Sequence, residues 1–304
     1  MLLHVGYHKT GSTWIQQLLF ANPQTRFVLP FDRLEINQRL VEPNDLVFDP
    51  EPERARYAPA IAQARAEARV PVVSSERLVG SPHTGGWDAQ NLALRLHAVF
   101  PDSRVLIILR EQQSVIRSMY LQYVREGGPL SLAQYLHPPG AGAFRIPSFD
   151  FEYYAYHRLI EHYQATFGTG ALLVLPFELL RADPNEFARR VCEFSGAATP
   201  SSVSPDSRNV ALSALSAQIK RRLNHFFVRD RLNPGAAFPF KRANRWILRA
   251  ARAFDRRLPD SWARPFDRRI RDCVAAEVGD RYRESNRRSG DRIGLDLGAF
   301  GYPT

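Results

Sequence analysis

The sequence predicts an α/β protein with a central, mostly parallel sheet flanked by helices. Two features predict it: short aliphatic runs alternate with helical patterns over residues 2–205, and the first run leads through a glycine-containing loop into a helix. Strands that alternate with helices form right-handed βαβ units, which build a parallel sheet with helices on its faces. With 304 residues, the chain is long enough to bury the core of such a fold.

The predicted strands are short apolar runs that end at loop residues. The clearest is RVLIIL at residues 104–109, because an unbroken aliphatic run is typical of a parallel strand that is buried on both faces. The other predicted strands are residues 2–6, 26–29, 71–76 and 171–175.

Helices are predicted between these strands from apolar residues at helical spacing. The first follows the glycine-containing loop and ends before Pro23. The stretch from residue 40 to 58 is rich in Pro, Asp and Glu, so we expect it to be irregular. The further predicted helices are residues 59–69, 88–100, 112–126, 150–167 and 184–194.

Beyond residue 205 the chain is helical in pattern and strongly basic. We therefore expect an α/β core at residues 1–205 and a helical C-terminal region at 206–304 that packs on it, in one domain overall. The net charge is +10; residues 208–292 hold 22 Lys and Arg against 9 Asp and Glu, whereas the remainder holds 19 against 22. This distribution favours an anionic partner: a phosphate-bearing cofactor, an acidic glycan, an anionic membrane surface or nucleic acid. A solvated arginine-rich surface is the alternative.

Composition disfavours several other classes of protein. No apolar run is long enough for a transmembrane helix, and the apolar residues before the loop are too few for a secretory signal. The two cysteines, Cys192 and Cys273, lack the spacing of metal ligands and indicate structural thiols in a reducing compartment. Histidines and carboxylates do not cluster at ligand spacing, so we expect no metal, and we expect a cytoplasmic location.

The segment GYHKTGSTW, residues 6–14, predicts an anion-binding loop between a strand and a helix. Gly6 and Gly11 have the separation of a Walker A loop, yet Ser12 stands where that motif has its lysine, and Lys9 comes before the second glycine. Backbone N–H groups at a helix N-terminus and the helix dipole favour an anion there. A structural strand-to-helix turn with an exposed lysine is the alternative.

A second motif, LREQQSVIRS, begins at the end of the predicted strand 104–109. Arg110 stands at the carboxyl end of that strand, and Ser118 lies eight residues, about two helical turns, further on. Ligands bind at the carboxyl ends of strands in α/β sheets, and a guanidinium holds a phosphate through two hydrogen bonds. With the first loop, this motif predicts two phosphate sites on neighbouring parts of one sheet, as a nucleotide phosphorylated at both ends requires.

The two motifs resemble those of the PAPS-dependent sulfotransferases, whose donor is 3′-phosphoadenosine 5′-phosphosulfate (PAPS). The family's first loop, Lys-x-Gly-Thr-Thr-Trp, is matched from Lys9 to Trp14, with Ser12 in place of the first threonine. The family's Arg, followed eight residues later by Ser, is matched by Arg110 and Ser118. The combination of the two motifs is the specific part of the resemblance.

The resemblance extends beyond the two motifs. Residues 174–196 are similar to the family's strand, Tyr/Phe-Glu-x-Leu, Asp-Pro and Cys-x-Phe-x-Gly pattern. The C-terminal sequence SNRRSGDRIGLDLGAFGYP is similar to that of many bacterial members. Together these segments cover most of residues 1–200 and the C-terminus.

The resemblance implies a role for each residue of the two motifs. Lys9 contacts the oxygen that bridges sulfate and nucleotide and stabilises the charge that develops there as the S–O bond breaks. Arg110 and Ser118 hold the 3′-phosphate. Trp14 lies against the adenine, or else it is the first core residue of its helix. The 5′-phosphosulfate is held by the backbone of Thr10, Gly11, Ser12 and Thr13, with the hydroxyls of Ser12 and Thr13.

The resemblance also implies a general base for the acceptor. The cytosolic branch of the family has a histidine after its third strand, but here Glu76 stands in that place, as in the carbohydrate-modifying branch. Its carboxylate would accept the proton of the acceptor hydroxyl. A strand cap or an ion pair with Arg77 or another arginine is the alternative role. His8, next to Lys9, is the reserve candidate.

The late basic segment with which the family covers the 3′-phosphate is not recognisable here. Lys241 and Arg242, or Arg208, are the candidates. The pattern of residues 246–258 puts apolar side chains on one helical face and arginines opposite, which predicts packing on the core or a lid. Contact with an anionic membrane surface is the alternative.

The leading prediction is an enzyme that moves a sulfuryl group from PAPS to a hydroxyl of a carbohydrate, lipid or small molecule, with an amine as the alternative acceptor. We expect residues 137–150 and the aromatic helix FDFEYYAYHRL to wall the acceptor site. A P-loop kinase is a rival, but it would need a lysine at position 12 and an acidic magnesium ligand where Arg110 stands. A non-enzymatic basic anion- or membrane-binding protein is the other rival, and no nucleic-acid-binding motif is recognisable.

Overall fold

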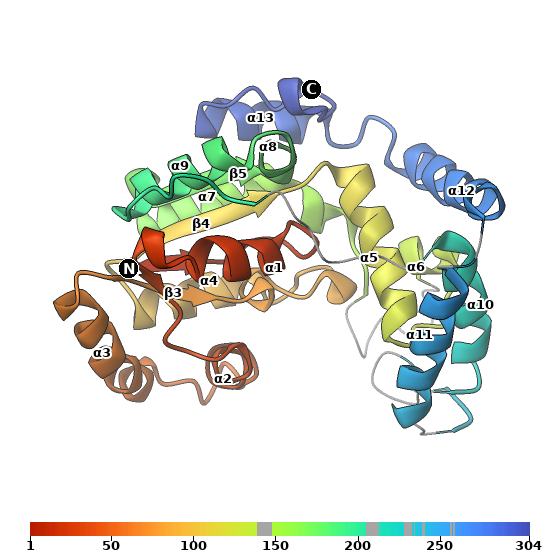
Figure 1. The fold of residues 1–304 in the computed structure, drawn as a ribbon, viewed down its shortest axis with the longest axis horizontal. Coiled ribbons are helices and arrows are strands. Elements are labelled where there is room, and N and C mark those ends of the chain that lie inside the picture. Colours follow the sequence, from red (N-terminus) through yellow and green to blue (C-terminus); the bar gives the residue numbers. More distant parts are fainter. Residues whose placement is uncertain are drawn as a thin grey trace. The chain divides into compact units, whose positions relative to one another are not determined.

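The computed structural model describes residues 1–138, 148–204, 213–227, 233, 235–238, 241–255, 257 and 259–304. Its centre is a five-stranded parallel sheet in the order β2-β3-β1-β4-β5 (Figure 1). This sheet confirms the predicted fold class and all five predicted strands. The strands are β1 (Leu2–His4), β2 (Phe27–Val28), β3 (Val70–Ser74), β4 (Arg104–Leu109) and β5 (Leu172–Pro176).

The strand order places a ligand crevice beside β1. The chain leaves β1 for β2 and β3 on one side of it and then crosses to β4 on the other side, so the direction of winding reverses there. Leu3 of β1 is in register with Val73 of β3 and Val105 of β4. In open α/β sheets, the carboxyl ends of strands at such a reversal are the usual place for ligands.

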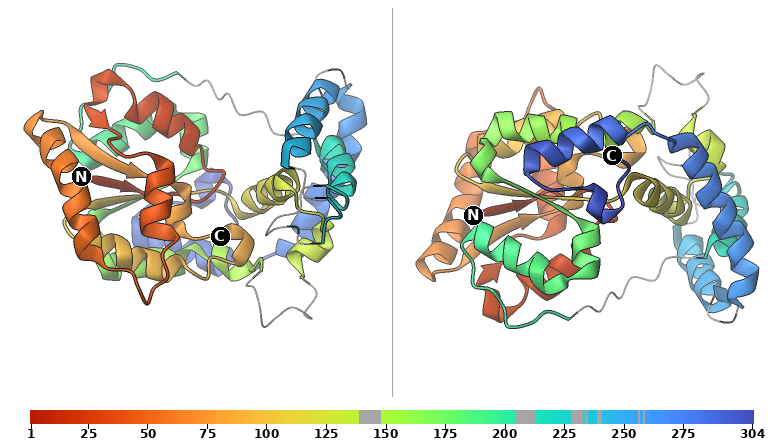
Figure 2. Two further views of the ribbon diagram at one scale, coloured as in Figure 1. Left: turned by 90° about the horizontal axis from the view of Figure 1, so that it is seen from below. Right: turned by 90° about the horizontal axis from the view of Figure 1, so that it is seen from above.

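The sheet belongs to one compact unit, called the first unit here, made of Met1–Glu111, Glu152–Ser207 and Tyr282–Thr304. Helices cover both faces of its sheet (Figure 2). One face packs on α1, which continues as the π-helical segment η1, and on α8 and α9; the other packs on α7, with α4 beside it. The helices of this unit are α1 (Ser12–Trp14), η1 (Ile15–Phe20), α2 (Arg33–Ile36), η3 (Asn37–Val41), α3 (Pro50–Ala66), α4 (Ala89–Val99), α7 (Tyr156–Phe167), α8 (Phe177–Ala182), α9 (Pro184–Ser195) and α13 (Arg283–Ile293).

The second unit comprises Gln112–Phe151 and Arg208–Arg281. Its buried Asn224 donates hydrogen bonds from Nδ2 to the carbonyls of Val124 and Gly128, both at 2.8 Å, and so ties α10 to the end of α5. The division differs from the predicted one at residue 205, because residues 112–151 group with the later chain and residues 282–304 with the sheet. The helices of the second unit are α5 (Gln112–Glu126), α6 (Leu132–Leu136), α10 (Ala214–Asn224), α11 (Lys241–Asp255) and α12 (Asp260–Val278).

The expectation that residues 40–58 are irregular is wrong over much of that stretch, because α3 begins at Pro50. The Asp49 carboxylate accepts the backbone N–H of Glu51 at 3.0 Å, and Pro50 occupies the first helical turn. Aspartate before a helix, proline in its first turn and glutamates close behind are a helix start signal. The same residue types had been interpreted as loop formers.

In the part of the chain that the structure describes, no helix is both long and apolar enough to cross a membrane. The same residues contain no group of three or more His, Cys, Asp or Glu side chains placed to hold a metal ion.

Candidate active site

The loop between β1 and α1 is held against β4 by its backbone. The N–H groups of Val5 and Tyr7 donate to the carbonyls of Leu106 and Ile108 at 3.0 and 3.3 Å, so the chain stays beside β4 beyond the end of the strand. The buried Thr10 hydroxyl donates to the Tyr7 carbonyl at 2.5 Å and closes the loop on itself. The loop is therefore a fixed structure at the carboxyl edge of the sheet.

Glycine is required at both ends of this loop. A Cβ atom on Gly6 would lie 3.0 Å from the His4 ring, and one on Gly11 would lie 2.9 Å from the Leu180 side chain of α8. Gly11 also has a φ of 84°, which side-chain-bearing residues rarely adopt. The two glycines that resemble a phosphate-binding loop thus let the backbone turn tightly between β1 and α8.

Lys9 lies at the turn of the loop with a φ of 67°, in the left-handed region. Its carbonyl accepts a hydrogen bond from Nη1 of Arg110 at 2.8 Å. A non-glycine residue keeps this conformation only where its surroundings hold it, and they do so at functional sites more often than elsewhere. The structure therefore brings together Lys9 and Arg110, which the sequence had placed in two separate motifs.

Ser12 is the first residue of α1 and is 3% exposed. Among the described residues, its hydroxyl oxygen has no hydrogen-bond partner. A buried hydroxyl without a partner costs free energy, and the first N–H groups of a helix also have no acceptor within the helix. An anion at this helix start would satisfy both, so the loop has the donors that a phosphate or sulfate group requires.

Arg110 follows β4 directly and is enclosed on several sides. Its guanidinium carbon lies 5.0 Å from the centre of the Phe177 ring, and the Tyr156 hydroxyl donates to its carbonyl at 2.5 Å. Burial lowers the pKa of Arg110 from its ordinary value, and the carboxylate of Glu178 opposes that shift. A cation fixed at the carboxyl end of a central strand is suited to holding a phosphate.

Two residues behind Arg110 had no assigned role in the sequence analysis. Glu178, at the start of α8, accepts the backbone N–H of Glu111 at 3.1 Å through Oε1. Its Oε2 accepts the hydroxyl of Tyr302 at 2.9 Å. Both residues lie in segments that resemble the sulfotransferases, which is the signal that could have drawn attention to them.

Trp14 has the environment of a core residue. It is 8% exposed, packs edge-on against Phe187 at a centroid distance of 6.3 Å, and donates from its indole nitrogen to the Ser204 carbonyl at 2.8 Å. These contacts agree with the structural role that the sequence left open beside contact with adenine. Thr13, one residue before it, is partly exposed.

Glu76 lies two residues beyond β3, at the start of the short helix η4 (Glu76–Val79). Its side chain is 21% exposed, and its carboxylate lies 3.7 Å from Arg33, a loose pair because the Arg33 side chain is 64% exposed. Arg77, the ion-pair partner considered from the sequence, instead pairs with Asp88 at 2.5 Å. Glu76 thus keeps an accessible carboxylate at the carboxyl edge of the sheet.

The aromatic helix that was expected to wall the acceptor site instead packs beneath the loop. Tyr153 and Tyr156 are buried, and their rings lie 5.0 and 4.9 Å from that of Tyr7. The Tyr7 hydroxyl donates to the Tyr153 carbonyl at 3.1 Å. These tyrosines support the loop from the core rather than presenting a surface to an acceptor.

Several predicted residues stand apart from this cluster. His8 is a partly exposed loop residue beside Lys9. Ser118 belongs to α5 of the second unit, where its hydroxyl donates to the Ser114 carbonyl at 2.9 Å. Arg208, the side chains of Lys241 and Arg242, and residues 139–147 of the expected acceptor wall lie outside what the structure describes.

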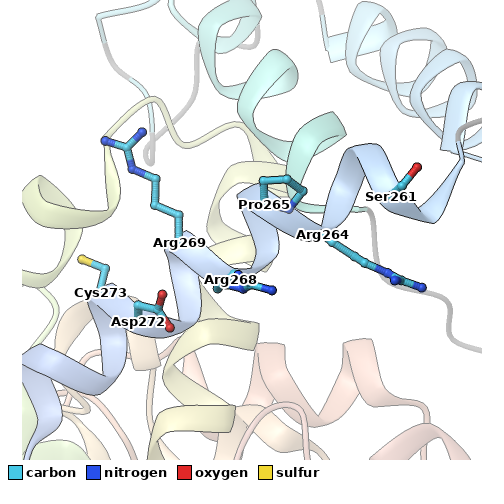
Figure 3. A pocket seen from close by; sticks show the side chains of 7 residues that line it. All are labelled: Ser261, Arg264, Pro265, Arg268, Arg269, Asp272 and Cys273. Atoms are coloured by element: carbon cyan, nitrogen blue, oxygen red, sulfur yellow. The ribbon is translucent and has the colours of Figure 1, made fainter.

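An open pocket of about 660 Å³ lies along α12 in the second unit (Figure 3). None of the residues predicted for the active site is among those that line it. The lining residues are Ser261, Arg264, Pro265, Arg268, Arg269, Asp272 and Cys273.

Comparison with known proteins identifies the family. A model of the sulfotransferase family matches residues 2–201, about two thirds of the chain, including the loop, Arg110 and Glu178. The fold resembles the crystal structure of a sulfotransferase from Alicyclobacillus acidocaldarius with a TM-score of 0.56 at 17% identity, over 99% of this chain and 98% of that one. A search of curated protein sequences finds no match. The chain belongs to the sulfotransferase family, and its fold is that of a bacterial sulfotransferase.

Proposed function

We propose that this protein transfers a sulfuryl group from PAPS to a hydroxyl group of a carbohydrate, lipid or small-molecule acceptor, with an amine as the alternative acceptor. Membership of the family supports sulfuryl transfer. The observation that carries the choice of donor is the hydrogen bond between Arg110 and the Lys9 carbonyl, because it joins two cationic side chains at one edge of the sheet. A donor with two separate phosphate positions matches such a pair.

The residues of the loop fit this donor. The partnerless hydroxyl of Ser12, together with the N–H groups that open α1, would hold the 5′-phosphosulfate. Arg110 would contact the 3′-phosphate, which distinguishes PAPS from ATP. Ser118 retains the role in 3′-phosphate binding that the resemblance implies.

Lys9 and Glu76 would divide the chemistry between them. As the bond between sulfur and the bridging oxygen breaks, negative charge develops on the nucleotide, and the Lys9 ammonium group would stabilise it. The acceptor hydroxyl attacks the sulfur in line with the leaving oxygen, and the Glu76 carboxylate would take up its proton. His8 is the reserve base because it adjoins Lys9. This division requires no metal.

Replacing Lys9 by alanine tests the proposal. We expect turnover of labelled PAPS with a panel of hydroxyl and amine acceptors to fall about 100- to 1,000-fold, as when one transition-state donor is removed. Binding of adenosine 3′,5′-bisphosphate should change much less, because the loop backbone and Arg110 remain. Transfer at the rate of the unmodified protein would remove Lys9 from the mechanism, and the acceptor that is labelled would identify the substrate class.

A further inference from the structure

The second unit carries all of the excess positive charge of the chain. Its two segments contain 21 Lys and Arg against 9 Asp and Glu, whereas the first unit contains 20 against 22. A net charge of +12 within the second unit produces a field that attracts anionic surfaces. The proposed donor site does not explain this charge, because Lys9 and Arg110 both belong to the first unit.

The second unit also exposes aromatic side chains. Among the described residues of the first unit, Trp87 is the one strongly exposed Phe or Trp side chain, at 63%. Large apolar side chains that face water mark interaction surfaces when they are gathered together. Those exposed on the second unit are Phe226, Phe238, Trp246, Phe254, Trp262 and Phe266.

Part of this exposed set forms a stripe along α11. Trp246, Ala250 and Phe254 follow one another at every fourth residue, which puts them on one helical face, and all three are exposed. The Arg249 guanidinium lies 5.2 Å from the centre of the Trp246 ring. The sequence adds arginines at positions 242, 245 and 252 of the same helix. We call Trp246, Ala250 and Phe254 the α11 stripe.

Helix α12 repeats the combination of arginine and exposed aromatic side chains. Trp262 and Phe266, four residues apart, are 64% and 39% exposed. Three arginines of the same helix, Arg264, Arg268 and Arg269, line its open pocket (Figure 3). None of these three forms an ion pair with a carboxylate among the described residues.

We propose that the second unit docks on an anionic lipid surface, with the aromatic side chains of the α11 stripe in the headgroup region and the arginines of α11 and α12 on lipid phosphates. Apolar side chains along one face of a helix, flanked by arginines, are the pattern of helices that lie in a membrane interface. Tryptophan is favoured at that depth because its ring has an apolar body and a polar N–H group. The docking surface is independent of the sulfuryl-transfer site, since it contains none of that site's residues.

Cosedimentation of the full chain with vesicles tests the proposal. We expect binding to phosphatidylcholine vesicles that contain about a third phosphatidylglycerol, little binding to pure phosphatidylcholine, and a marked loss near 0.5 M salt, where charges are screened within about 4 Å. Trp246→Glu combined with Phe254→Glu should weaken binding at least tenfold, because two charged side chains replace two apolar ones in the interface. Trp87→Glu is the matched control, since it places the same charge at an equally exposed tryptophan of the first unit.

Tryptophan quenching adds a readout of depth. Vesicles with brominated lipid chains should quench the fluorescence of the chain, and Trp246→Phe should remove part of that quenching while cosedimentation persists. Stabilisation by adenosine 3′,5′-bisphosphate establishes that each variant is folded, so loss of docking and loss of donor binding are separate outcomes.

Three results would overturn docking by the α11 stripe. The first is equal binding to vesicles with and without phosphatidylglycerol. The second is unchanged binding of the Trp246→Glu, Phe254→Glu variant, which would leave charge alone as the attraction. The third is tighter binding to single-stranded RNA than to vesicles with the same dependence on Trp246, which would assign the surface to nucleic acid.

Discussion

At the scale of single residues, Glu76 carries the most specific chemical claim. Its carboxylate is accessible and only loosely paired with Arg33. In Glu76→Gln the amide fills the same space but accepts no proton, so we expect kcat to fall about 100- to 10,000-fold. Affinity for adenosine 3′,5′-bisphosphate should be unchanged, because the substitution does not alter the loop. An unaltered kcat for Glu76→Gln beside a large loss for His8→Asn would transfer the role of base to His8.

Tyr302 allows a matched test of the support behind Arg110. Its hydroxyl donates to Glu178, so Tyr302→Phe removes a hydrogen bond to a carboxylate and should lower the free energy of unfolding by about 1.5–3 kcal/mol. Tyr163 is equally buried, yet its hydroxyl has no hydrogen-bond partner among the described residues. Tyr163→Phe should therefore be close to neutral. Denaturant titration measures both variants, and equal losses would contradict the assignment.

The sequence shows Lys9, Gly11 and Arg110 because each belongs to a short motif. It does not show that Arg110 binds the Lys9 carbonyl, because 101 residues separate the two. The contact of Tyr302 with Glu178 spans 124 residues and is invisible for the same reason. Residue types at fixed spacing could be predicted, whereas the partners of their side chains depend on how distant segments meet.

At the scale of elements, β1 carries a buried histidine that makes stability depend on pH. His4 is fully buried, its Nδ1 lies 2.7 Å from the Ser74 hydroxyl, and burial lowers its pKa from 6.5 to about 4. The folded protein therefore keeps His4 neutral at a pH where the unfolded chain binds a proton. Its contribution is complete above pH 6.5 and is lost as the pH falls toward 4, by about 3 kcal/mol in total.

Thermal unfolding between pH 7.5 and 4 measures this contribution. We expect His4→Asn to flatten the dependence of Tm on pH in this range. The matched variant is His137→Asn, since the His137 side chain is 57% exposed, and it should keep the slope of the unmodified protein. A slope that is identical with and without His4 would show that other groups cause the dependence.

The elements themselves divide into those that the sequence shows and those that it hides. All five strands were predicted, because unbroken aliphatic runs such as 104–109 are typical of parallel strands. The start of α3 was missed because Asp, Pro and Glu are common both in loops and in the first turn of a helix. Only the contact of the Asp49 carboxylate with the Glu51 N–H distinguishes the two.

At the scale of the whole molecule, the sequence located the basic region but not the compact units. The predicted division at residue 205 followed composition, whereas the units follow contacts between distant segments. Asn224 of α10 bonds to carbonyls about 100 residues earlier, and His157 of α7 lies 2.8 Å from the Ser285 hydroxyl of α13. Such contacts assign residues 112–151 to one unit and 282–304 to the other, and composition contains no trace of them.

The measurement that tests the proposed donor most directly is thermal stabilisation of the whole protein by adenosine 3′,5′-bisphosphate, compared with ATP and Mg²⁺. At about one hundred times its Kd, a ligand that binds only the folded state adds about 2.7 kcal/mol of stability. We predict that the bisphosphate raises Tm, that ATP with Mg²⁺ does so far less, and that Arg110→Ala abolishes most of the difference. Stabilisation by ATP and Mg²⁺ alone would contradict a PAPS-dependent sulfotransferase.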